Sequence, residues 1–141
     1  MEASRKYIDH TADILFQAEA STLPGLFEQC ALAVEESQIE LENVEPFKKI
    51  VITGKNKKIE HLLFDFLDDL LFYKDSERLI FSKFEIKVKE EKGFFKLNCK
   101  AFGDILSDKH QQKVDVKAIT MHLFEVKKIA GGWKAQVLID I

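Results

Sequence analysis

The chain alternates between extended and helical hydrophobic patterns. In residues 14–20 apolar side chains occupy every second position, which predicts a half-buried strand. From Leu23 to Val34 the apolar residues recur at three- and four-residue spacing, which predicts an amphipathic helix capped by Thr22, with Pro24 tolerated in its first turn. The polar residues 39–46 predict a loop.

A second helix is predicted from about Lys58 to Tyr73, where the helical spacing is clearest. Its apolar stripe comprises Ile59, Leu62, Leu63, Phe66, Leu67, Leu70 and Leu71. Three carboxylates fall outside this stripe, on Asp65, Asp68 and Asp69. We interpret them as a solvated or partner-facing flank rather than a metal site, because no other type of ligand joins them at helical spacing.

The rest of the chain has strand-like patterns. Strands are predicted over residues 47–53, 79–88, 94–101, 114–126 and 133–141, with hairpin turns at 90–93 and 129–132 and a polar loop over 103–113. We therefore expect a single domain spanning residues 1–141 with an α+β fold. Its two layers would hold a mostly antiparallel sheet and two principal helices.

Composition narrows the class of protein. The chain is 46% hydrophobic and 32% charged, which excludes a disordered chain, and its net charge of −3 argues against electrostatically driven nucleic-acid binding. Lysines cluster at Lys55, Lys57 and Lys58, and we interpret this cluster as a solvated loop rather than a basic patch. Cys30 and Cys99 lack zinc-type spacing and are expected to be buried free thiols in a reducing cytoplasm. We find neither a signal peptide nor an apolar run of about 18 residues, so no membrane span is expected.

Charged residues beside apolar strand sequence mark a candidate site. They are Asp13, Lys117 and Asp140, and a buried charge is costly unless it is paired, hydrogen-bonded or bound to a metal. Asp140 is one residue from the carboxylate of Ile141, and two carboxylates so close suit a hard cation if the C-terminus is held in place. The residues alone do not establish that the first and last strands are neighbours. The alternative is that Asp13 and Asp140 are ordinary polar residues at strand ends.

The last hairpin permits a prediction of register. Regular pairing from the turn would place Met121 opposite Asp140, with Lys117 and Ile119 on the face of Asp140. Lys117 would then lie two same-face positions from the partner of Asp140. A contact between them is not predicted unless a β-bulge closes the gap.

The four histidines are scattered at positions 10, 61, 110 and 122. His10 and Asp13 have a spacing compatible with metal ligation, although a histidine near a strand start is more often structural. His122 lies in a strand with apolar residues on both faces and is expected in the core. We find no nucleophile–base pair and no glycine-rich phosphate loop.

Several segments, taken in order, carry a resemblance to a known family. They are residues 7–13 (Tyr-Ile-Asp-His-Thr-Ala-Asp), 62–71, 109–110 (Lys-His), 116–120 (Val-Lys-Ala-Ile-Thr) and 132–141, which ends in Ile-Asp-Ile. Together they resemble the archease family over nearly the whole chain. Met121 departs from the pattern, since an aromatic residue is expected before His122.

The resemblance implies a function. Archeases assist the RtcB-type RNA ligase, which joins RNA ends bearing a 2′,3′-cyclic phosphate or 3′-phosphate to a 5′-hydroxyl with GTP and a divalent metal. They are thought to promote guanylylation of the ligase in tRNA splicing or RNA repair. By resemblance, a divalent cation, often calcium, would be held by Asp13, Asp140 and a main-chain or terminal oxygen of Ile141. Lys117 matches a functionally important lysine of the family.

We therefore expect a cytoplasmic accessory protein rather than an enzyme. Its cofactor would be Ca²⁺, with Mg²⁺ or Mn²⁺ as alternatives, because oxygen ligands suit these ions. Its partner would be the RNA ligase, with RNA met only through the ligase and no membrane involved. Two alternatives stay open, which are metal-assisted hydrolysis at the same carboxylates and a general protein-binding or chaperone module.

Overall fold

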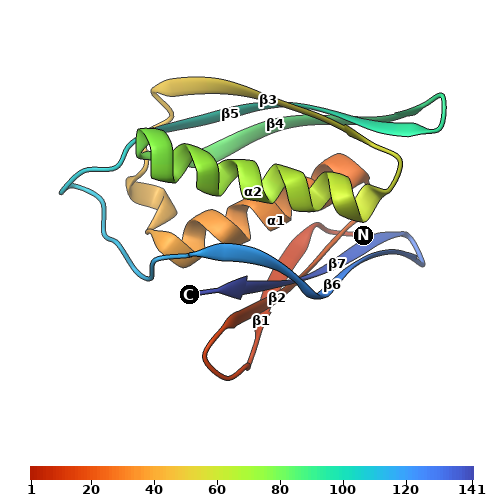
Figure 1. Cartoon of the computed structure of the whole chain (residues 1–141), viewed down its shortest axis with the longest axis horizontal. Coiled ribbons are helices and arrows are strands. Elements are labelled where there is room, and N and C mark those ends of the chain that lie inside the picture. Colours follow the sequence, from red (N-terminus) through yellow and green to blue (C-terminus); the bar gives the residue numbers. More distant parts are fainter.

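The computed structural model describes all residues from 1 to 141 (Figure 1). The elements in chain order are β1 (Ser4–Ile8), β2 (Ile14–Ala20), α1 (Leu23–Gln38), a 3₁₀ turn (Leu41–Asn43), β3 (Lys48–Asn56), α2 (Ile59–Glu77), β4 (Leu79–Glu91), β5 (Phe94–Ile105), β6 (Ala118–Ile129) and β7 (Gly132–Asp140).

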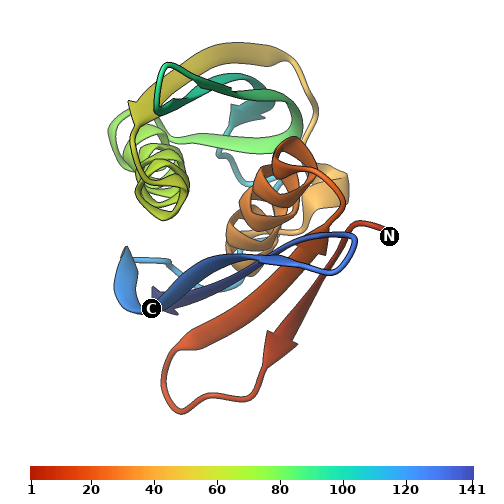
Figure 2. The same cartoon turned by 90° about the vertical axis from the view of Figure 1, so that its right-hand side faces the viewer.

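The strands form two antiparallel sheets with the helices between them (Figures 1 and 2). One sheet has the order β1-β2-β7-β6 and the other the order β3-β5-β4. The predicted α+β fold with two principal helices is confirmed. The strands divide between two sheets rather than forming one, so the molecule has three layers, and α1 and α2 each contact both sheets.

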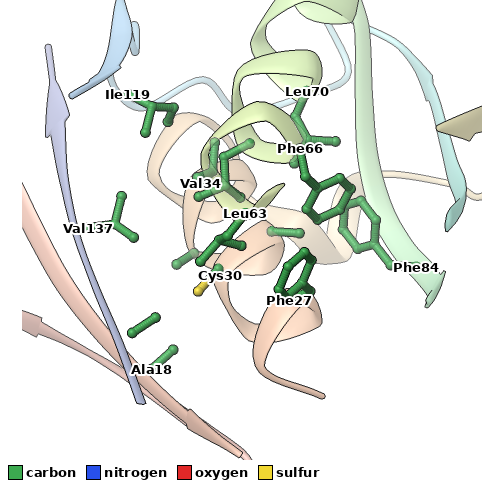
Figure 3. Packing of buried hydrophobic residues seen from close by; sticks show 14 of the residues in the cluster. Ala18, Phe27, Cys30, Val34, Leu63, Phe66, Leu70, Phe84, Ile119 and Val137 are labelled. Carbon is green, nitrogen blue, oxygen red and sulfur yellow. The ribbon is translucent and has the colours of Figure 1, made fainter. Parts of the chain in front are cut away.

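The core lies around the two helices (Figure 3). Phe27 of α1 stacks on Phe66 of α2 with 5.8 Å between the ring centroids. Ile119 and Val137 face these helices from the four-stranded sheet, and Phe84 faces them from the other sheet. Burial on two sides explains why both helices carry wide apolar stripes.

Some boundaries differ from those predicted. Strand β1 was missed, and α2 continues past Tyr73 to Glu77, where Arg78 ends it in the left-handed conformation with φ 56°. Strand β6 begins at Ala118 rather than at residue 114, because residues 113 and 114 donate main-chain hydrogen bonds to the end of α1 instead of to β7. Cys30 and Cys99 are buried and unpaired, as predicted. Neither helix has both the length and the apolar composition needed to cross a membrane.

A carboxyl group is buried in the interface between α1 and β4. Glu35 is fully buried, and its Oε2 accepts a hydrogen bond of 3.0 Å from the main-chain N–H of Phe81. The other oxygen has no hydrogen-bond partner in the protein. Burial raises the pKa of Glu35 to about 8, although the Phe81 N–H and the charge of Lys74 act in the opposite direction. The folded protein therefore retains this proton at pH values where the unfolded chain releases it.

This buried group predicts a pH-dependent stability. Between pH 4.5, the ordinary pKa of a glutamate, and about pH 8, stability should fall as the pH rises, since the unfolded chain gives up the Glu35 proton first. Glu35→Gln should remove roughly 2–4 kcal/mol of that fall. Urea unfolding at both ends of the window, with the exposed Glu42→Gln as control, measures it. An unchanged pH profile in Glu35→Gln would show that this carboxyl is not the source.

Candidate functional site

Strand β7 lies in the middle of its sheet and brings three distant segments together. Ile139 pairs with Ile14 of β2 on one side and with Ile119 of β6 on the other. Asp140 follows Ile139 directly, and Asp13 directly precedes Ile14. The register therefore places Asp13 and Asp140 at neighbouring positions at one end of the sheet, and β2 and β7 are neighbours, which the sequence left open.

A large β-bulge sets the register of β6 against β7. Thr120 pairs with Leu138 and Glu125 pairs with Gln136, so residues 121–124 stand opposite Val137 alone. Leu123 adopts φ 60° within the bulge, and its carbonyl accepts a 3.0 Å hydrogen bond from Nε2 of Gln136. Such an insertion shifts the pairing of every residue beyond it.

Because of the bulge, the predicted register of β6 against Asp140 is wrong. Asp140 pairs with Ala118 and not with Met121. Ile119 lies on the opposite face, at 5% exposure, so its predicted position on the face of Asp140 is wrong. The gap to Lys117 is closed, because the main-chain N–H of Lys117 donates a 2.8 Å hydrogen bond to the carbonyl of Asp140.

The side chain of Lys117 is exposed and forms no ion pair within 4 Å. It does not need the internal polar partner that a buried lysine would require. The buried lysine of this region is Lys74 of α2, whose side chain is 11% exposed. Its ammonium donates to Gln38 at 2.6 Å, to Asp115 at 2.9 Å and to the carbonyl of Val116 at 3.2 Å.

These bonds fix the segment that leads into Lys117. The hydrogen bond and charge of Lys74 hold the pKa of Asp115 below its usual range, with a smaller contribution from Lys117. Sequence reasoning missed this anchor, because Lys74 is one polar residue among several at the end of a helix. Nothing in the hydrophobic pattern distinguishes it.

The histidines are placed differently from the prediction. His122 is exposed, because it lies in the bulge and its side chain has left the regular alternation. The buried histidine is His110, whose Nδ1 accepts a 2.9 Å hydrogen bond from the main-chain N–H of Ser107. His110 Nε2 lies 3.9 Å from Asp104, so the loop before Lys117 closes on a polar cluster.

An open cleft of about 440 Å³ adjoins Asp13. Its lining includes Tyr7, His10, Glu36 and Lys113 in addition to Asp13. The guanidinium of Arg5 contacts Glu36 through two hydrogen bonds of 2.7 Å, and the Tyr7 hydroxyl also donates to Glu36. Burial alone would raise the pKa of Glu36, but the bonds from Arg5 and Tyr7 hold it below its usual value. This ionised carboxylate is fully engaged, which leaves Asp9 and Asp13 as the carboxylates of the cleft without an ion pair.

The oxygens at the strand ends suit a hard cation. No group of three or more His, Cys, Asp and Glu side chains is arranged to hold a metal. A cation between Asp13 and Asp140 would thus need a further oxygen, and the half-buried Ile141, which follows Asp140 in the chain, is the candidate to supply it. His10 is exposed on the same cleft as Asp13 and supplies the one imidazole there. Oxygen donors in an exposed setting fit Ca²⁺, Mg²⁺ or Mn²⁺, which retain water ligands.

The two antiparallel sheets around two helices, with charged residues at the end of β7, place this chain in a class of small α+β proteins. Residues 6–141 match the model of the Archease protein family. Protein archease of Methanosarcina mazei is 36% identical over 140 residues, covering 96% of this chain and 94% of that protein, and that of Pyrococcus furiosus is 35% identical over 138 residues, covering 96% and 97%. This chain belongs to the archease family.

Solved structures of similar proteins share this fold. The solution structure of protein 1598 from Methanobacterium thermoautotrophicum is 34% identical, with a TM-score of 0.87 over 97% of this chain and 98% of that one. A Thermotoga maritima crystal structure, described as an archease and possible chaperone, covers both chains fully with a TM-score of 0.63 at 20% identity, which supports the shared fold.

The juxtaposition of Asp13 and Asp140 predicts a cross-link. Cysteines at both positions should form a disulfide on mild oxidation, since the bond requires Cα atoms about 4.4–6.8 Å apart. Cys30 and Cys99 are buried and should not compete. Mass spectrometry of Asp13→Cys/Asp140→Cys detects the bond, with Asp68→Cys/Asp140→Cys as the control pair. Equal oxidation of the two pairs, or none in the first, would contradict the register.

Proposed function

We propose that this protein is a metal-binding accessory factor of an RtcB-type RNA ligase. It would promote guanylylation of the ligase and allow multiple turnover, in cytoplasmic tRNA splicing or RNA repair. The proposal is supported by membership of the archease family and, above all, by the convergence of Asp13, Asp140 and Lys117 at one end of the sheet.

The chemistry of this sheet end suits recognition of an anionic partner. Asp13 and Asp140 would hold a divalent cation with an oxygen of Ile141, and the cation would supply a fixed positive charge. Lys117 is held beside Asp140 through its main chain, so its exposed ammonium is free to meet a phosphate or carboxylate of the ligase. Its backbone is held in place before the partner arrives, which reduces the entropy cost of binding.

Two other functions use the same surface. The description of the Thermotoga relative as a possible chaperone favours a protein-binding module, which would act on unrelated clients. Metal-assisted hydrolysis would instead require activity of the purified chain alone on phosphorylated RNA. Assays of the chain alone, with a matching ligase and with unrelated aggregating proteins separate the three functions.

The cation site predicts the effect of losing either carboxylate. Asp13→Ala and Asp140→Ala should each weaken Ca²⁺ binding by tenfold or more, about 1.4 kcal/mol, because each removes a charged oxygen ligand. Calorimetric titration of metal-stripped protein measures the affinity. Asp68→Ala, which removes an exposed carboxylate of α2, is the control. Wild-type affinity in both site variants would rule out this site.

The exposed position of Lys117 predicts that removing its side chain reduces activation of the ligase without reducing the stability of the protein. Lys117→Ala should change the free energy of unfolding by no more than about 0.5 kcal/mol, as is usual for an exposed side chain without an ion pair. Ligase guanylylation should fall sharply. The matched control is Lys127→Ala, at an exposed lysine within β6. Normal activation by a folded Lys117→Ala protein would remove Lys117 from the site, and a ligase that ignores the wild-type chain would refute the proposed function.

A further inference from the structure

The outer face of the three-stranded sheet is strongly basic. The three-stranded sheet covers the helices from one side (Figure 2). On β3, β5 and β4 buried residues alternate with exposed ones, so the exposed residues form the face away from the helices. The paired positions of this face hold seven lysines, which are Lys49, Lys55, Lys83, Lys87, Lys89, Lys96 and Lys100. The carboxylates of this face are Glu85, which pairs with Lys100, and Glu91, which lies at its end opposite Phe94. A chain with a net charge of −3 thus concentrates positive charge on one surface.

The positions of these lysines lower the stability of the folded sheet. Lys96 pairs with Lys55 on one side and with Lys89 on the other, which places three ammonium groups in one row across the sheet. Like charges directly opposite one another destabilise a sheet. Ion pairs relieve little of this repulsion, since within this face they join only Lys83 to Glu85 and Lys96 to Glu91. An anion bound from outside would neutralise the remaining charges.

A hollow on the same face is shaped for such an anion. It has a volume of about 420 Å³ and is lined by Lys87, Lys89, Lys96, Asn98 and Lys100. No carboxylate and no apolar side chain lines it. Four lysines around one hollow can neutralise several negative charges, as on successive phosphates, rather than a single small anion.

Aromatic rings stand at both ends of the basic face. The Lys55 ammonium lies 4.3 Å from the ring centroid of Phe94, and the Lys83 ammonium lies 5.2 Å from that of Phe102. Both rings are half-buried. A charged surface combined with aromatic rings is typical of proteins that bind single-stranded nucleic acid, where phosphates meet cations and bases stack on rings.

We propose that this face binds single-stranded RNA through its phosphate backbone. A broad sheet face cannot enter the major groove of a duplex, whereas a single strand can lie across it. The central row places Thr53 and Asn98 beside Lys87, and their side chains can exchange hydrogen bonds with the 2′-hydroxyl that distinguishes RNA from DNA. Val51 is the one exposed aliphatic residue of the face, too little apolar surface for insertion into a membrane.

This inference goes beyond the proposed function, in which RNA is met only through the ligase. The basic face is formed by β3, β5 and β4, while Asp13, Asp140 and Lys117 belong to the other sheet and its connections. The two surfaces can therefore be inactivated separately.

The test is fluorescence anisotropy with the purified full chain and a labelled oligouridylate of about 16 nucleotides. Lys87→Gln/Lys89→Gln/Lys100→Gln should weaken binding at least tenfold at low salt. The slope of log affinity against log salt should fall by about two, as expected for three lost phosphate contacts. The charge-matched control is Lys6→Gln/Lys127→Gln/Lys128→Gln, which changes exposed lysines of the four-stranded sheet and should leave the affinity within twofold of wild type. Circular dichroism confirms that both variants fold.

Several results would overturn the proposal. Absence of binding at about 50 mM salt, or equal losses in both triple variants, would remove this face as an RNA site. Equal affinity for a DNA oligomer of the same length, or for duplex RNA, would refute the assignment to single-stranded RNA. Tighter binding of polyglutamate or of phosphatidylserine vesicles would assign the face to an acidic protein or to a membrane instead.

Discussion

The register of β7 between β2 and β6 is the constraint on which the candidate site depends. Val137 and Ile139 are fully buried on the inner face of this strand, and a slip of one residue would turn both toward solvent. Once these two side chains are packed on the helices, Asp140 must point outward at the end of the strand. The pairing of Ile139 with Ile14 and Ile119 then brings Asp13 and Lys117 to the same place.

The bulge in β6 allows this neighbouring strand to pair with β7 in that register while its own apolar residues face the core. The inward-facing residues near the hairpin turn include Phe124 and Val126, at even positions, whereas Ile119 lies at an odd position. A regular ladder would bury one group and expose the other. Residues 121–124 opposite Val137 change the alternation, so Ile119 enters the core while Val126 keeps its pairing with Ala135. The cost is an unusual backbone at Leu123 and the exposure of Met121 and His122.

This comparison shows what the sequence could and could not predict. Both helices and most strands followed from hydrophobic spacing, because each buries a continuous apolar face. The bulge was missed because regular pairing was assumed, although the switch from even to odd apolar positions between Val126 and Ile119 was a usable signal. The anchors Glu35 and Lys74 left no such signal, since single polar residues inside or beside an apolar stripe look the same whether they are buried or exposed.

The distribution of charge on the surface was also not predictable from the sequence alone. A net charge of −3 is an average, and it concealed a basic sheet face whose alternate positions are mostly lysine, namely Lys83, Lys87 and Lys89 on β4 and Lys96 and Lys100 on β5. The lysines near position 55 were assigned to a solvated loop, whereas Lys55 lies within β3 and pairs with Lys96. Only the sheet topology brings these separate runs together.

The most direct test of the central claim is a crystal structure of the protein grown with Ca²⁺, with anomalous data collected at long wavelength. The account predicts a calcium peak between Asp13 and Asp140, with oxygens of both side chains about 2.3–2.6 Å from the ion and the main chain of Lys117 still bonded to Asp140. A peak elsewhere, such as along Asp65 and Asp69, or full calcium occupancy without contact to either aspartate, would contradict it.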